Sequence, residues 1–144
     1  MELTEALAKL AELEKKLYAY QAADSALYLD GTTVAPRDTA EGRGVALGVL
    51  AGERHKLFSA PETGELLDFL WERRGELDQL RCRQVEELRR SYAQLTRIPA
   101  EEYMEYAMLT NEADDLWHRA KEKSDFELFR PVLEKLVAFN IKFA

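Results

Sequence analysis

The stretch ELTEALAKLAELEKKLYAYQ, residues 2–21, decides the fold class of this chain. Apolar side chains recur along it every three or four positions, at Leu3, Leu7, Leu10, Leu13, Leu17 and Tyr20. This spacing places them on one stripe of a helix. We expect a long amphipathic helix over about residues 2–27. An ordered loop should follow at LDGTTVAP, residues 29–36, where a glycine, two β-branched threonines and a proline disfavour helix.

The rest of the chain repeats this helical periodicity and contains no strand-like alternation. Five further helices are predicted at about residues 39–58, 61–73, 76–96, 100–123 and 125–143. Two capping boxes support these starts, Ser59 with Glu62 before the third helix and Ser124 with Glu127 before the sixth. The predicted fold class is therefore all-α, a bundle of about six helices that forms a single domain over residues 1–144.

The second predicted helix, which Asp38 or Thr39 can cap, carries Gly44, Gly48 and Gly52 four residues apart. Three positions without side chains then share one face, although each glycine costs about 1 kcal/mol relative to alanine in a helix. We expect another backbone to pack closely there. The alternative is that these glycines only loosen an exposed helix.

Composition limits the class of protein. The chain has 144 residues, of which 47% are hydrophobic and 33% charged, and its formal net charge is -7. This composition is that of one globular domain, and the negative charge argues against a nucleic-acid partner. The single cysteine, Cys82, allows no intramolecular disulfide, and no window approaches the roughly 18 apolar residues of a membrane span. We therefore expect a cytoplasmic protein that binds neither membrane nor nucleic acid.

The fourth predicted helix is rich in arginine on the face opposite its apolar stripe. These arginines are Arg81, Arg83, Arg89 and Arg90, and the acidic residues interspersed among them are Glu76, Asp78, Glu86 and Glu87. A surface for an anionic partner is one interpretation. We favour a solvated, ion-paired face.

Ligands for a catalytic metal are scarce. A helical zinc protease supplies two histidines one turn apart through H-E-x-x-H, but His55 and His118 are the only histidines and this motif is absent. Asp115 and His118 approximate one half of a di-metal carboxylate site, whose other half is missing. We expect His118 at a helix surface. Cys82 has no histidine near it in sequence, so a catalytic thiol is not predicted.

The segment LDGTTVAPRDTAEGRG, residues 29–44, resembles a signature near the N-terminus of the thermostable (Taq-type) zinc carboxypeptidases. That family's pattern is tryptophan-aspartate, threonine, proline, arginine and then a histidine further along the helix. The matching positions are Asp30, Thr33, Pro36, Arg43 and His55, in the same order and spacing. Leu29 occupies the place of the tryptophan.

The resemblance continues from Ile98 to Val137 and so covers nearly the whole chain. The family's segment runs from a proline through a long helix to tryptophan, alanine, aspartate-phenylalanine, phenylalanine and proline. Here these positions are Pro99, Trp117, Ala120, Asp125, Phe126, Phe129 and Pro131.

The resemblance implies an all-helical enzyme several times longer than this chain, usually homodimeric, that releases residues one at a time from peptide C-termini. In such enzymes the H-E-x-x-H motif, the third zinc ligand and the residues for the substrate carboxylate lie downstream of the matched region. The matched region thus implies a helical wall or lid of the peptide groove. We expect no catalytic residue and no cofactor in this chain, zinc in the full-length enzyme, and inactivity of the chain alone.

Two further expectations concern partners and the polar signature residues. No Gly, Asn or Pro stop signal follows the last apolar turns, LVAFNIKFA, so we expect a chain cut before its catalytic part, paired with that part or with a second copy. Asp30, Arg43 and His55 are expected to form a buried polar network, and the alternative is that one of them touches substrate.

A function of another class is an autonomous helical interaction or self-association module. The leucine stripes would then present apolar faces to partner helices instead of forming a core. Replacing Leu10 and Leu17 by Glu separates these cases, since it abolishes folding only if both residues belong to the core.

Overall fold

A computed structural model describes all 144 residues and consists of helices and turns. The six α-helices are α1 (Leu3–Thr33), α2 (Ala40–Phe58), α3 (Pro61–Glu72), α4 (Gln79–Leu95), α5 (Ala100–Lys123) and α6 (Arg130–Phe143). Single 3-10 turns, η1 (Arg37–Thr39), η2 (Arg74–Glu76) and η3 (Phe126–Leu128), lie between some of them. The predicted all-α class with six helices is confirmed. No helix combines the length and the apolarity that a membrane span requires.

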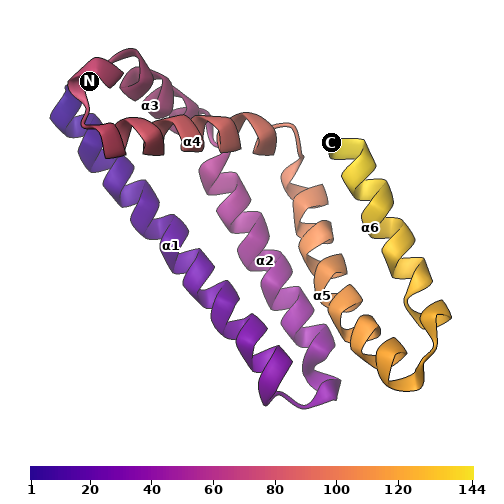
Figure 1. Cartoon of the computed structure of the whole chain (residues 1–144). Coiled ribbons are helices and arrows are strands. Elements are labelled where there is room, and N and C mark those ends of the chain that lie inside the picture. Colours follow the sequence, from indigo (N-terminus) through magenta and orange to yellow (C-terminus); the bar gives the residue numbers. More distant parts are fainter.

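Four of the helices lie side by side as a single antiparallel layer in the order α1, α2, α5, α6 (Figure 1). The helices α3 and α4 cross this row at the end where the N-terminus lies. Because only α5 and η3 pack extensively against α6, α6 forms one edge of the layer. Both broad faces of the row are therefore open over much of their length.

The hydrophobic core lies where α1 meets α3 and α4. It consists of Ala6, Leu10, Leu66, Leu67, Leu70 and Val85, all buried. Leu10 is fully enclosed and Leu3 and Leu7 pack around it, so the leucine stripe of α1 serves as core at this end. Burial of these side chains fixes the two crossing helices on the layer.

The centre of the layer is the contact between α2 and α5, which runs along the three glycines. Gly44, Gly48 and Gly52 are buried, and α5 places Asn111, Met108 and Met104 against them in that order. A Cβ atom at Gly48 would lie 2.5 Å from the Met108 Cγ. α5 therefore approaches this face of α2 closely, but it places side chains against the glycines, so the prediction that another backbone packs on them was wrong in that respect.

The first helix extends beyond the predicted loop start. It continues to Thr33, where the hydroxyls of Thr32 and Thr33 donate to the carbonyls of Tyr28 and Leu29 in the preceding turn and so are satisfied within the helix. The prediction of a loop over residues 29–36 was therefore wrong for residues 29–33. The helix ends only as the chain approaches Pro36, whose preceding residue disfavours helical geometry.

The predicted capping boxes were also wrong. Ser59 Oγ donates to the His55 carbonyl at 2.7 Å, so it closes the end of α2 instead of starting α3, which begins after Ala60. Ser124 takes a left-handed conformation (φ 51°) and ends α5. Asp125 then accepts a hydrogen bond from the Glu127 backbone N–H, so a 3-10 turn precedes α6 and that helix begins at residue 130.

The starts of the second and fourth helices differ as well. Neither Asp38 nor Thr39 caps α2, because residues 37–39 form η1 and Thr39 Oγ1 donates to the Pro36 carbonyl at 2.5 Å. α4 begins only at Gln79, where the Asp78 carboxylate accepts from the backbone N–H of Arg81.

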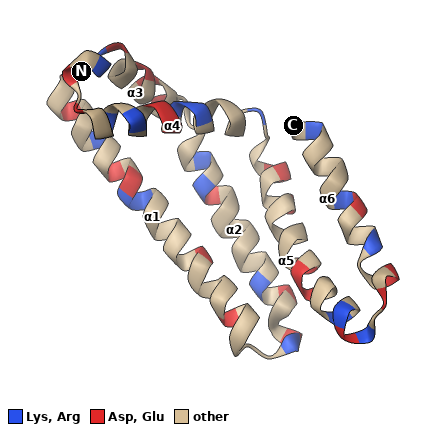
Figure 2. Ribbon diagram, viewed as in Figure 1, with Lys and Arg blue, Asp and Glu red and all other residues tan.

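Three of the four arginines of α4 are ion-paired, as predicted, although only Arg83 has one of the interspersed acidic residues as its partner. Arg83 pairs with Glu86 on the same helix, Arg89 with Asp68 of α3 at 2.8 Å, and Arg81 with Glu14 of α1 at 3.5 Å. Basic and acidic residues are interspersed along α4 and α5, whereas α3 carries acidic residues only (Figure 2). Such exposed pairs contribute little stability individually, but two of these pairs join α4 to the helices that it crosses.

Candidate functional site

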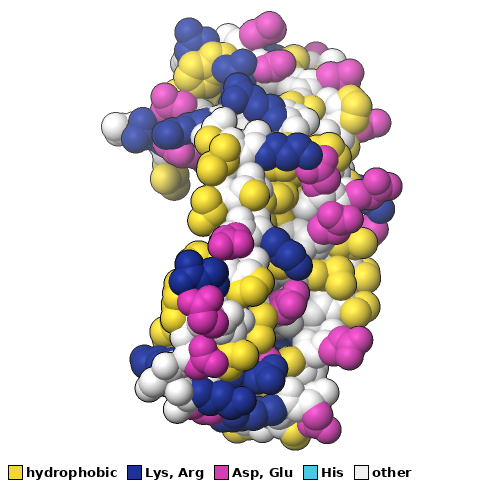
Figure 3. Space-filling view, turned by 90° about the vertical axis from the view of Figure 1, so that its right-hand side faces the viewer, with side chains coloured by type: hydrophobic (Ala, Val, Ile, Leu, Met, Phe, Trp, Pro, Cys, Tyr) yellow, Lys and Arg dark blue, Asp and Glu magenta, His cyan; other side chains and the backbone are white.

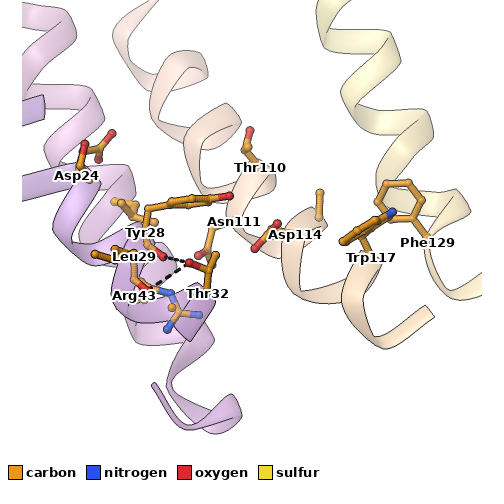
Figure 4. A pocket seen from close by; sticks show the side chains of 14 residues that line it. Asp24, Tyr28, Leu29, Thr32, Arg43, Thr110, Asn111, Asp114, Trp117 and Phe129 are labelled. Atoms are coloured by element: carbon orange, nitrogen blue, oxygen red, sulfur yellow. Dashed lines mark hydrogen bonds between the residues drawn. The ribbon is translucent and has the colours of Figure 1, made fainter. Parts of the chain in front are cut away.

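An open groove of about 830 Å³ crosses the layer between α1, α2, α5 and the turn before α6 (Figure 4). Its apolar walls come from Tyr28 and Leu29 of α1, Leu47 of α2, Trp117 of α5 and Phe129. A groove of this size with mostly apolar walls and a few polar groups is typical of a ligand-binding site.

Charged and amide side chains lie around this groove. Asp24 comes from α1, Arg43 from α2, and Asn111 and Asp114 from α5. The amide of Asn111 donates to the Ala40 carbonyl at 3.1 Å, so it also ties α5 to the start of α2. The groove therefore combines hydrophobic walls with both signs of charge.

Arg43 occupies the space beside Gly31, and this contact joins the end of α1 to α2. A Cβ at Gly31 would collide with the Arg43 guanidinium. The Arg43 Nη1 donates to Thr39 Oγ1 at 3.3 Å. The absence of a side chain at residue 31 thus lets an arginine lie across the last turn of α1 at the groove.

The predicted network of Asp30, Arg43 and His55 is not formed. Asp30 is exposed and makes no side-chain hydrogen bond, and Arg43 bonds to Thr39. His55 is buried far along α2, where its Nε2 lies 3.1 Å from the Leu95 carbonyl and its Nδ1 3.3 Å from Ser59 Oγ. Since a carbonyl only accepts, Nε2 carries the proton, and His55 serves to join α2 to the end of α4.

The other signature residues are divided between the groove and helix ends. Thr33 and Pro36 lie at the end of α1, Pro99 at the start of α5, and Pro131 in the first turn of α6. Asp125 begins η3 by accepting from the Glu127 N–H at 3.1 Å.

Three aromatic signature residues lie together near η3. Trp117 and Phe129 line the groove, and Phe126 packs edge-to-face on Phe129 at a centroid distance of 6.3 Å. Of all the signature residues, Arg43, Trp117 and Phe129 are the ones that the groove brings together.

An ion pair joins the turn after α1 to the end of α5. Arg37 Nη1 donates to a Glu122 carboxylate oxygen at 2.9 Å. The hydrogen bond from Arg37 holds the pKa of Glu122 below its usual range, and the same bond raises the pKa of Arg37. Arg37 also borders a second, smaller hollow between α2 and α5, of about 540 Å³.

The residues of this chain do not fit a zinc site. No group of three or more His, Cys, Asp or Glu side chains is placed to hold a metal ion. Both nitrogens of His55 are engaged inside the protein. His118 lies at the surface of α5, as expected, with its Nε2 3.9 Å from the Asp114 carboxylate.

Sequence reasoning missed most of the groove. The groove residues Tyr28, Leu47 and Asn111 belong to no recognisable sequence motif, and Leu29 was noted only as a departure from the family pattern. The glycine spacing indicates that a side chain packs against Gly44. That this side chain is Asn111 follows only once the pairing of α2 with α5 is known.

Three comparisons with known proteins agree. Residues 9–144 match the family model described as Carboxypeptidase Taq (M32) metallopeptidase. Carboxypeptidase 1 of Bacillus subtilis (strain 168) is 35% identical over 132 residues, which are 92% of this chain and 26% of that protein. A solved structure titled "BsuCP Crystal Structure" superposes with a TM-score of 0.92 and 33% identity, over 96% of this chain and 28% of that one. The chain thus spans about a quarter of the length of the curated relative.

Proposed function

This chain belongs to the carboxypeptidase Taq (M32) metallopeptidase family, and we propose that it forms a helical wall or lid of the peptide groove of a zinc metallocarboxypeptidase. Such an enzyme releases residues from the C-termini of peptides. The observation that carries the proposal is the open groove lined by Tyr28, Leu47 and Trp117.

The chemistry of this groove suits an extended peptide. A peptide substrate presents apolar side chains and backbone polar groups in alternation, and the groove offers apolar walls beside Arg43, Asn111 and Asp114. A wall of this kind holds the substrate and excludes water from the reacting bond.

The hydrolytic step depends on groups outside this chain. In the complete enzyme, zinc supplies a Lewis acid for the peptide carbonyl and an activated water. The chain's own residues are proposed to bind and orient the peptide only. The chain alone should therefore not hydrolyse peptides even when zinc is added.

A chimera tests this proposal. The region of the Bacillus subtilis Carboxypeptidase 1 that matches this chain is replaced by residues 1–144, and release of C-terminal residues from peptides is measured. The chimera should be active, and Trp117→Ala should raise KM about tenfold with little change in kcat, since loss of roughly 1.4 kcal/mol of uniform binding corresponds to that factor.

The matched control is Leu80→Ala, which removes an exposed apolar side chain of α4 that does not line the groove. This variant should retain the KM of the unmodified chimera. An unchanged KM in both Trp117→Ala and Leu47→Ala would contradict a role of the groove in substrate binding. Zinc-dependent hydrolysis by the isolated chain would contradict the proposal that the hydrolytic groups lie outside this chain.

A further inference from the structure

Helix α6 has two apolar stripes, and the layer uses only one of them. The inward stripe comprises Val132, Leu136, Phe139 and Phe143. Phe139 stacks on Tyr106 of α5 with ring centroids 4.2 Å apart, and Lys142 pairs with Glu102 at 2.7 Å. These contacts fix which side of α6 faces α5.

The second stripe lies about a third of a turn away, is half-buried at Leu133 and becomes exposed toward the C-terminus. It consists of Leu133, Val137 and Ile141, spaced four residues apart. Val137 is 48% exposed and Ile141 is 73% exposed. A helix that is apolar on more than one side normally lies inside a fold, with neighbours on each of those sides.

The helix at the opposite edge of the layer is built differently. On its exposed surface α1 carries ion pairs, Glu5 with Lys9 at 2.7 Å and Glu12 with Lys15 at 3.8 Å. Figure 3 faces the α6 edge and shows hydrophobic side chains reaching the surface there between charged ones. α1 also exposes Tyr18 (71%), but the aliphatic residues spaced four apart and free of ion pairs lie on α6.

The comparisons indicate which neighbour this is. The solved relative contains these six helices in the same arrangement, with a TM-score of 0.92, yet this chain covers only 28% of it. Nearly three quarters of that fold therefore lies outside the matched helices and is available to cover the free side of α6.

We infer that the second apolar stripe of α6, Leu133, Val137 and Ile141, is the surface on which the zinc-bearing remainder of the peptidase fold packs. This inference rests on the proposed function, because it takes its occupant from the complete enzyme. It assigns α6 as the junction through which the helical wall is held in place.

Thiol accessibility tests this assignment directly. Val137→Cys and Ile141→Cys are made separately, in a Cys82→Ser background, both in the isolated chain and in the chimera described above. Alkylation rates at each position are followed by peptide mass spectrometry. Both new thiols should react rapidly in the isolated chain and at least ~10-fold more slowly in the chimera, since a covered thiol must wait for local opening.

The matched control is Lys15→Cys on α1, whose side chain is 77% exposed. Its rate should stay within about twofold between the two proteins, because Lys15 lies in the ion-paired part of α1, at the edge of the layer opposite α6. Unchanged rates at residues 137 and 141 in an active chimera would overturn the inference and leave the proposed function intact. An inactive chimera in which both positions are protected would instead contradict the proposed function alone.

A second copy of the chain is the competing occupant. If Val137 and Ile141 are already protected in the isolated chain, and light scattering shows a dimer that Ile141→Lys dissociates, the stripe pairs two copies and the inference is wrong. A monomer with rapidly reacting thiols is the expected result for the isolated chain.

Discussion

Replacing Gly48 by alanine tests whether the α2–α5 contact holds the layer together. In a helix interior, alanine is favoured over glycine by about 1 kcal/mol, so the substitution stabilises the protein unless the new methyl collides. At Gly48 the methyl would lie 2.5 Å from Met108 Cγ and 3.0 Å from its sulfur. Relieving such an overlap moves Met108, which is 38% exposed, away from Gly48 and loses part of the α2–α5 packing, at a cost of about 1–3 kcal/mol.

Gly42, on the same helix, is the matched control. Nothing lies within 4 Å of a Cβ added there, so Gly42→Ala meets no neighbour. The free energy of unfolding should therefore be lower in Gly48→Ala than in Gly42→Ala by about 1–3 kcal/mol. For a chain of this size the difference corresponds to roughly 3–10 °C in Tm.

The assay is urea and thermal unfolding of both variants, followed by circular dichroism at 222 nm. Adding Met108→Ala should relieve the collision, so a double-mutant cycle should give a favourable coupling of about 1 kcal/mol between Gly48→Ala and Met108→Ala. Equal stabilisation by Gly42→Ala and Gly48→Ala, with no coupling to Met108, would refute the close contact between α2 and α5.

Two other predictions concern the core and the Arg37–Glu122 pair. Leu10→Ala should lower the free energy of unfolding by about 2–5 kcal/mol, whereas Leu80→Ala should change it by less than about 0.5 kcal/mol, as measured by urea unfolding. Glu122→Gln should lower Tm at neutral pH, because the folded state holds the pKa of this carboxyl below its unfolded value. That contribution is present above the unfolded pKa and is lost as pH falls through the folded pKa, so Tm profiles of wild type and Glu122→Gln should converge at acid pH. A constant difference down to acid pH would argue against the pair.

Sequence reasoning succeeded where a local pattern has one structural solution. The spacing of the leucines from Leu3 to Leu17 required a helix with one apolar side, and Leu10 lies in the core. The glycine spacing from Gly44 to Gly52 likewise required a close neighbour, although only the structure identifies that neighbour as α5.

Prediction from the sequence failed where local and long-range interactions compete for the same residue. Ser59 fits a capping box, but its hydroxyl bonds instead to the His55 carbonyl of the preceding helix. The expected network of Asp30, Arg43 and His55 is absent for the same reason. His55 bonds to the Leu95 carbonyl, forty residues away in sequence, and Arg43 packs on Gly31. The groove was not predictable for a related reason, because two of its walls, α2 and α5, lie side by side although α3 and α4 separate them along the chain.

The single-layer arrangement connects the proposed function to the inference about α6. A row of helices buries only the sides that face its neighbours, so every other apolar surface must serve something else or cost solubility. Two of these surfaces are the groove with Tyr28 and Trp117 and the free stripe of α6 with Val137 and Ile141. The groove is an open hollow with convergent polar groups, which suits a ligand that binds and leaves, whereas the stripe is a row of aliphatic side chains without polar groups, which suits permanent burial. In the proposed groove wall, the groove thus contacts the peptide, and the stripe of α6 attaches the wall to the rest of the enzyme.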